Sequence, residues 1–210
     1  MKFTKIPEDT FKKLQMNAGI LTDTFTPSTG VIGNLLGATT GGNSFAATPE
    51  YEDFGEDIDN CPKNTKELKK LKSWEIKLTG TYLTVTAVSA KSLAGAADID
   101  TEDTTHVVPR NELQDSDFED IWWIGDYSEL NGDSNGGFCA IHLMSALSTG
   151  GFQVKSTDKG KGQFAYEYTA HYSISTPDKV PFEIYVKEGS EETSSVTDKT
   201  AASETRTTEE

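Results

Sequence analysis

The sequence FAYEYTAHYSI, at residues 164–174, alternates between two kinds of side chain. One set is aromatic or apolar: Phe164, Tyr166, Tyr168, Ala170, Tyr172 and Ile174. The intervening residues are small or polar. Because successive side chains of a β-strand point to opposite faces of a sheet, the alternation predicts a strand with one face on a core. A β fold is therefore expected.

Further strands are expected on both sides of this segment. Trp74, Ile76 and Leu78 alternate with polar residues, and residues 182–187 repeat the pattern. Residues 119–125 (EDIWWIG) and 137–147 (GFCAIHLMSAL) are apolar on both faces, which favours central strands. Shorter strands are expected at residues 19–26 and 105–109. Six to eight strands predict a mainly β (α+β) protein of two packed antiparallel sheets, sandwich-like or barrel-like.

Helical patterns are few. One amphipathic stripe follows the spacing of a helix that lies against one flank of the sheets: Val85, Val88, Ser92, Leu93, Ala96 and Ala97. A short helix is also expected at residues 10–17, where Phe11 and Leu14 share a face. Residues 65–72 (TKELKKLK) favour a helix but are too few to form one alone.

Residues 27–48 are rich in Gly, Thr, Ser and Asn, and we expect a long loop there. Loops of this length within a domain are usually functional or disordered. Five apolar residues argue against disorder: Val31, Ile32, Leu35, Leu36 and Phe45. These side chains need a partner, and a neighbouring subunit is one candidate.

The chain is acidic, with a net charge of −15. An ordinary nucleic-acid binder needs cations to displace phosphate counterions, so that class is excluded. Residues 188–210 contain seven acidic and two basic residues and no aromatic one, which predicts a disordered acidic tail after a domain at residues 1–187. Without the tail, the domain still carries −10. We expect no secretory signal and no membrane span.

Three motifs allow catalytic or metal chemistry. Ser134 lies in a G-x-S-x-G pattern, with Asp158 and His171 available for a triad, but a hairpin context is expected rather than the strand-to-helix turn of hydrolases. Cys139 and His142 have a C-x-x-H spacing without a second ligand pair. The carboxylates of residues 50–59 could bind a divalent cation, although charge runs are usually solvated. We therefore expect no catalytic residue, cofactor or metal.

The order of several segments resembles the major tail (tail-tube) proteins of long-tailed phages and prophages, chiefly those of Gram-positive hosts. The resemblance covers about residues 17–187, and none of its segments is a catalytic signature. The segments are NAG 17–19, LGATTGG 36–42, ATP 47–49, DFGEDIDNCPKNTKEL 53–68, TGT 79–81, PRN 109–111, DFEDIWWIGDY 117–127, SALSTGGF 145–152, KGKGQF 159–164 and VPFEIYV 180–186.

The resemblance implies a structural virion protein whose copies form hexameric rings that stack into the tube of the viral tail. It implies further contacts with the tape-measure, tail-terminator and baseplate (distal tail) proteins. During genome ejection, DNA would pass through the lumen without specific binding. An acidic wall suits this passage because it repels phosphate.

Particular residues are expected to serve this assembly. The interface candidates are Phe25, Pro27, Leu35, Leu36, Phe45, Phe182 and Ile184, of which the first five are expected to be buried only in the assembly. Glu75 and Glu167, on polar faces of predicted strands, are candidates for charge in the lumen.

Two other functions remain open. A carbohydrate-binding β-sandwich module would stack sugars on Trp122, Trp123 or the tyrosines. A hydrolase would depend on Ser134. The module predicts a monomer that binds glycans, whereas a tube protein assembles without a ligand.

Overall fold

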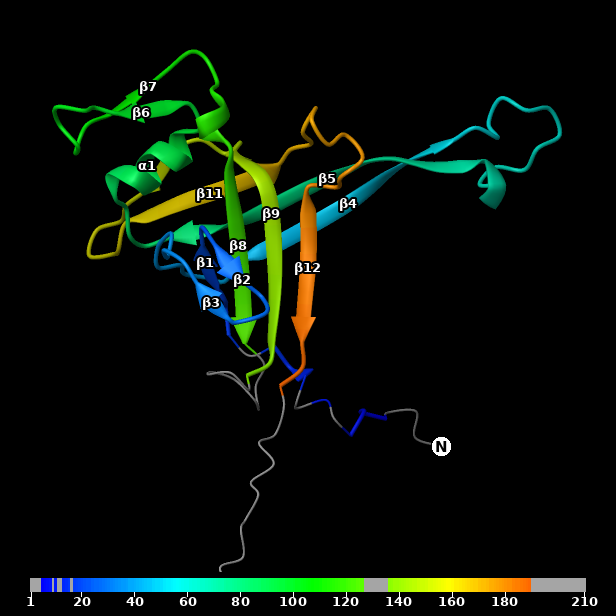
Figure 1. Ribbon diagram of the computed structural model, residues 1–210, viewed down its shortest axis with the longest axis horizontal. Coiled ribbons are helices and arrows are strands. Elements are labelled where there is room, and N and C mark those ends of the chain that lie inside the picture. The colour runs from blue at the N-terminus through cyan, green and yellow to red at the C-terminus, as the bar shows by residue number, and fades with distance from the viewer. Residues whose placement is uncertain (1–4, 9, 11–12, 16, 127–135, 190–210) are drawn as a thin grey trace, which may run out of the picture.

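The computed structural model describes residues 5–8, 10, 13–15, 17–126 and 136–189. The expected fold class is confirmed: the protein is mainly antiparallel β and sandwich-like, with one α-helix in the described part (Figure 1). The strands are β1 Ile20–Thr22, β2 Phe25–Thr26, β3 Val31–Ile32, β4 Ser44–Asp53, β5 Lys69–Tyr82, β6 Ala97–Ile99, β7 Val107–Pro109, β8 Glu119–Asp126, β9 Phe138–Ser148, β10 Gln153–Lys155, β11 Gln163–Ala170 and β12 Phe182–Lys187.

The two packed layers are halves of one continuous sheet. Its strand order is β1-β8-β9-β11-β5-β4, with β12 paired to β9 and β10 paired to β11. Strand β9 belongs to both halves because its first part pairs with β12 and its last residues pair with β11. In Figure 1 the strands β8, β9 and β12 cross the direction of β11, β5 and β4. The chain therefore closes its sandwich by folding a single sheet over itself.

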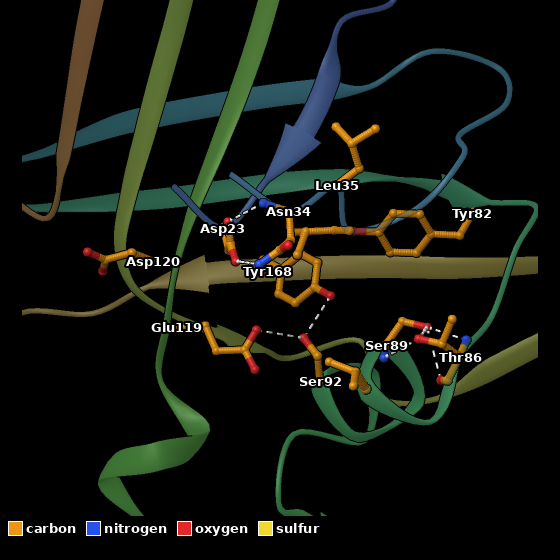
Figure 2. A pocket seen from close by; sticks show the side chains of 12 residues that line it. Asp23, Asn34, Leu35, Tyr82, Thr86, Ser89, Ser92, Glu119, Asp120 and Tyr168 are labelled. Carbon is orange, nitrogen blue, oxygen red and sulfur yellow. Dashed lines mark hydrogen bonds between the residues drawn. The ribbon is translucent and has the colours of Figure 1, made fainter. Parts of the chain in front are cut away.

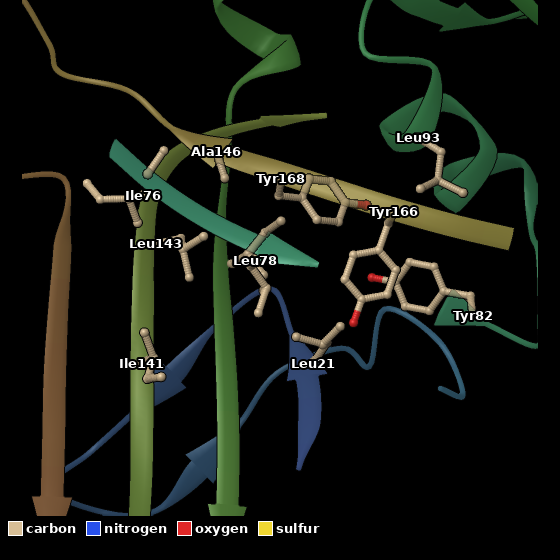
Figure 3. Close-up of a cluster of buried hydrophobic side chains, with 12 residues drawn as sticks. Leu21, Ile76, Leu78, Tyr82, Leu93, Ile141, Leu143, Ala146, Tyr166 and Tyr168 are labelled. Atoms are coloured by element: carbon tan, nitrogen blue, oxygen red, sulfur yellow. The ribbon is translucent and has the colours of Figure 1, made fainter. Parts of the chain in front are cut away.

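The main core lies between these halves (Figure 3). Ile76 and Leu78 of β5, which the alternation along that strand predicts to be buried, belong to one cluster with Ile141 and Leu143 of β9. Residues that fill this core, all less than a tenth exposed, are Leu21, Ile76, Leu78, Tyr82, Leu93, Ile121, Ile141, Leu143, Ala146, Tyr166, Tyr168 and Ala170. The prediction of central strands at β8 and β9 is confirmed, since each is paired on both sides.

A second cluster covers the outer face of β8 and β9. Phe25 packs edge-on against Trp122 and Phe138, with ring centroids 5.5 and 5.2 Å apart. Phe25 is only 8% exposed. It lies in the hairpin β2–β3, which the tight turn at residues 27–30 closes. This hairpin thus seals one outer face of the sandwich.

Asn17, Ala18 and Gly19 fasten the start of the chain to β8. The Asn17 side chain donates to Asp126 Oδ2 at 2.8 Å and accepts the Asp126 N–H at 3.1 Å. The Trp123 indole N–H donates to the Ala18 carbonyl at 3.0 Å. Gly19 adopts φ +74°, a backbone conformation that favours glycine. β1 is thereby held in register beside β8.

The helix α1 (Ala87–Ala94) is shorter than predicted, and it buries Leu93 of the predicted stripe but not Val88. Thr86 caps it by accepting the Ser89 N–H, while the Ser89 hydroxyl accepts the Thr86 N–H. Ser89 and Leu93 are buried, whereas Val88 is 65% exposed. The predicted stripe through Val85 and Val88 is therefore wrong, because this capping arrangement turns Leu93 toward the core.

Arg110 anchors the small β6–β7 sheet beside α1. Its guanidinium pairs with Asp117, whose side chain is fully buried, at 2.5 Å, and with Asp98 at 2.6 Å. Hydrogen bonds from the Gln114 N–H and Arg110 outweigh burial and lower the pKa of Asp117. This charged cluster ties β6 and β7 to the 3-10 turn Asp115–Asp117.

Four other expectations need correction. Residues 65–72 form a 3-10 turn, Lys66–Leu68, and then β5, because pairing with β4 overrides helix propensity. The strand predicted to Ile174 ends at Ala170, where its ladder with β9 ends, and Ile174 is 100% exposed. The loop predicted at residues 27–48 contains β3 and half of β4. For the helix predicted at 10–17, Phe11, Lys12 and Met16 lie outside the described residues, and the described residues of that range are not in an α-helix.

Candidate functional site

The longest hairpin of the protein extends away from the sandwich. β5 pairs with β11 only as far as Lys77, so from Ile76 outward its ladder partner among the described residues is β4 alone. Eight residues of β5 lie in this part, which corresponds to about 26 Å at the usual rise per residue. Figure 1 shows the hairpin projecting beyond the other strands. We call residues 47–76 the arm.

The two strands of the arm carry opposite charge. Glu50, Glu52 and Asp53 of β4 run antiparallel to Lys69, Lys70 and Lys72 of β5. Glu52 is opposite Lys70 and Asp53 is opposite Lys69, while Lys72 lies 3.4 Å from Glu50. The Ser73 hydroxyl donates to Glu50 at 2.8 Å and, with Lys72, lowers the pKa of that carboxyl. The acidic and basic runs of the sequence are thus partners across one ladder.

Asp53 organises the tip of the arm. Its carboxylate accepts the N–H groups of Gly55 and Asn64 at 2.9 and 2.8 Å, and these bonds lower the pKa of Asp53. Asn60 and Asn64 adopt positive φ there. In the described residues no group of three or more acidic, His or Cys side chains is arranged to hold a metal ion. The carboxylate run therefore shapes a turn and pairs with lysines.

Large apolar side chains are exposed along the arm. Tyr51, Phe54, Ile58 and Leu71 are between 42 and 55% exposed. Tyr51 and Leu71 are cross-strand partners and share a face with Lys69, whose ammonium lies 5.3 Å from the Tyr51 ring centroid. An isolated two-stranded hairpin is marginally stable in water. The arm thus exposes apolar surface without a third strand to support it.

The base of the arm is fixed to the body. Trp74 packs edge-on against Phe182 at 5.4 Å, and Phe45 lies 5.9 Å from the same ring. The Trp74 N–H, which points away from β4, donates to the Tyr172 hydroxyl at 3.1 Å. Its cross-strand partner is Pro49, which has no N–H. At Pro49 and Trp74, therefore, neither the outer edge of β4 nor that of β5 has a free N–H group to donate to another strand.

Among the described residues, strand β12, like the arm, has an unpaired edge and exposed apolar side chains. It pairs with β9 and, in the described part of the chain, with no other strand. Ile184 and Val186 are 54 and 61% exposed, although their register partners Ile141 and Cys139 continue the inner face of β9. An apolar edge strand invites pairing with another chain.

The predicted assembly residues divide into three groups. Phe25 is buried within the chain, so the expectation that it is buried only in an assembly is wrong; its ring fills the β2–β3 hairpin. Leu36, Phe45 and Phe182 pack partly against the main core, and Pro27 is half-buried. Leu35 and Ile184 are exposed and remain candidates.

Glu75 and Glu167 lie beside one lysine. Lys77 Nζ is 2.6 Å from Glu75 and 4.0 Å from Glu167, and hydrogen bonding to Glu75 raises the pKa of Lys77. Glu75 and Lys77 are two residues apart on β5, so their side chains share the outer face of the sheet. Lys77 offsets part of the negative charge on that face.

A pocket of about 610 Å³ lies between α1 and the sheet (Figure 2). Ser92 donates to Glu119 at 3.1 Å, and its oxygen lies 3.0 Å from the Tyr168 hydroxyl. Burial raises the pKa of Glu119, although the bond from Ser92 opposes this shift. Asp23, which also lines the pocket, is held by Asn34. Ser92, Glu119 and Tyr168 thus form one hydrogen-bonded group of the pocket lining, and Asp23 and Asn34 form another.

The zinc motif does not form a metal site among the described residues, and Ser134 of the catalytic motif lies outside them. His171 packs on Phe118, with Nδ1 at 3.3 Å from the Ser145 carbonyl oxygen. His142 stacks on Trp122 at 4.0 Å and lies beside Asp120, whereas Cys139 is three positions away on the same strand. Side chains at that spacing point to opposite faces of a strand.

The two tryptophans expected to stack sugars are packed against other side chains of the protein. Trp122 is 7% exposed beneath Phe25, His142 and Tyr185. Trp123 is partly buried against the main core, and its N–H is used by Ala18. These two indoles therefore serve packing.

No protein-family model matches this sequence, and no curated protein matches it. Among the described helices, none has the length and apolar character that a membrane crossing requires.

Proposed function

We propose that this protein is a structural subunit that assembles with its own copies into stacked rings, forming the tail tube of a long-tailed bacteriophage. The arm carries the proposal: a two-stranded hairpin with exposed Tyr51, Phe54, Ile58 and Leu71 has too little packing of its own. A neighbouring copy would supply the missing contacts.

Sheet edges support the same function. β12 and β4 are outer strands in the described sheet, each hydrogen-bonded to one neighbouring strand. Two different surfaces that bind each other produce a head-to-tail contact, which closes into a ring or continues as a filament. Exposed Ile184 and Val186 would add apolar area to such a contact.

The charge fits a conduit for DNA. With −10 on residues 1–187, six copies would place about −60 on a ring. An anionic lumen repels phosphate and lets DNA slide, whereas a cationic one would bind it in a salt-dependent way. Glu75 and Glu167 are the proposed lumen residues, although the neighbouring Lys77 offsets part of their negative charge. In a virion, the tape-measure, terminator and baseplate proteins would contact the ends of the tube.

Assembly is the direct test. The purified chain should form rings or hollow rods in negative-stain electron microscopy and a high-mass species in size-exclusion chromatography with light scattering. Phe54→Ser with Ile58→Ser should reduce that species at least tenfold at equal concentration. Leu113→Ser, at a site 57% exposed but remote from the arm in sequence, is the matched control.

A wild-type chain that stays monomeric, even with tail-initiation proteins present, would contradict the proposal. Binding of glycans by that monomer would instead support the carbohydrate module, and hydrolysis of ester or peptide substrates that depends on Ser134 would support the enzyme.

A further inference from the structure

We infer that arms of neighbouring copies pair edge to edge, with the acidic strand of one arm beside the basic strand of the next. The inference rests on the proposed assembly and specifies its lateral contact. It follows from three observations on the arm: its outer backbone edges are unpaired in the described structure, its two strands carry opposite charge, and strand pairing is blocked at its base.

Both long edges of the arm are available. In the described residues, β4 has no ladder partner except β5, and the part of β5 beyond Lys77 has none except β4. Unpaired N–H and C=O groups along such edges are templates for another strand. Copies with the same orientation would place β5 of one arm antiparallel to β4 of the next, which continues the existing ladder.

The base of the arm limits where pairing can occur. Pro49 removes a donor from the outer edge of β4, and the Tyr172 hydroxyl occupies the outward N–H of Trp74 on β5. Between Pro49 and Trp74 and the tip of the arm, the outer edges of residues 50–53 and 69–73 remain available for pairing with another strand. That length is close to an ordinary strand pairing of about five residues.

Charge decides which edges meet. Residues 50–53 carry three acidic and no basic side chains, and residues 69–73 carry three basic and no acidic ones. Pairing β4 with β4, or β5 with β5, would place like charges opposite each other, which is destabilising. The acidic edge therefore selects the basic edge of another copy. Such a contact is head-to-tail, the kind that closes rings.

The test reverses the charge of one strand of the arm at a time. Glu50→Lys with Glu52→Lys gives an arm with two basic strands, and Lys70→Glu with Lys72→Glu gives one with two acidic strands. Asp53 and Lys69 are kept because Asp53 holds the tip and Lys69 contacts Tyr51. Lys159→Glu with Lys161→Glu, exposed residues near a different turn, is the charge-matched control.

At low ionic strength, each reversed variant should lose at least tenfold of its assembled species while the control assembles as wild type. An equimolar mixture of the two variants should recover assembly, and so should the chain with all four substitutions. Recovery by mixing cannot come from refolding of an individual arm, because each chain keeps its altered charges. Near-ultraviolet circular dichroism of the body should be unchanged in all variants.

Assembly of each reversed variant at the wild-type level would overturn the edge pairing while leaving the tube proposal intact. A mixture that remains unassembled would overturn it as well. A wild-type chain that never assembles would overturn both proposals, so the two failures are distinguishable.

Discussion

The indole of Trp123 occupies the space where a side chain on Gly19 would lie. A Cβ atom built on Gly19 would overlap the Trp123 indole nitrogen and lie 2.8 Å from the Ile124 carbonyl oxygen. The same indole donates to the Ala18 carbonyl, so the ring cannot move away without losing that bond. This close approach joins β1 to β8.

Gly19→Ala should therefore lower the free energy of unfolding by more than its positive φ alone explains. The φ of +74° costs an alanine about 1–2 kcal/mol, and displacement of Trp123 adds to it. Gly41→Ala is the control, since Gly41 has φ +75° and open space around it. Urea denaturation measures both, and equal losses would refute a role for the Trp123 contact.

Arg110 and Asp117 should be strongly coupled. Arg110→Ala leaves the fully buried Asp117 side chain without its cation, which should cost about 3–5 kcal/mol. A double-mutant cycle with Asp117→Asn should give a coupling energy above about 1 kcal/mol. The exposed pair Lys179–Glu183, at 3.5 Å, should give less than about 1 kcal/mol in the same cycle. Similar values for both pairs would contradict the buried role.

Glu119→Gln should stabilise the protein at neutral pH. Burial raises the folded-state pKa of Glu119, so its ionisation destabilises the fold as pH rises above the unfolded-state pKa. The gain over wild type should be larger at pH 7 than at pH 4, where the carboxyl is largely protonated in both states. Denaturant midpoints at the two pH values check this. Equal gains at the two pH values would contradict this role of Glu119.

Ile184→Asp should weaken assembly and leave the monomer folded. The side chain is 54% exposed on β12, so a charge there meets solvent in one copy but would be buried in a contact between copies. Sedimentation velocity should show at least a tenfold loss of the assembled species, with an unchanged melting temperature. Ile174→Asp, at a position 100% exposed, should leave assembly unaltered.

The strands of the core could be predicted because their signal is local. Ile76, Leu78, Tyr166 and Tyr168 alternate with polar neighbours, and each is buried in the structure. The helix was harder to place, since Val85 and Val88 fit its period as well as Leu93 does. Only the bonds between Thr86 and Ser89 fix which face turns inward.

The arm was missed because its signal spans two runs of opposite charge. Glu50, Glu52 and Asp53 indicated a solvated or cation-binding cluster, and the lysines after residue 65 indicated a helix. An acidic run followed by a basic run of similar length, with Asn60 and Pro62 between them, also fits a hairpin. Reading the two runs as cross-strand partners would have found it.

Strand β9 serves as a common member of both layers, with β8 along one edge and β12 and then β11 along the other. Neither layer can detach while the other stays intact, since separation would rupture a hydrogen-bonded ladder as well as the apolar interior. Mechanical load applied at β12 would therefore pass through the backbone of β9 to the opposite layer. If the proposed filament forms, that linkage would resist bending of the subunit by sharing force between its two layers.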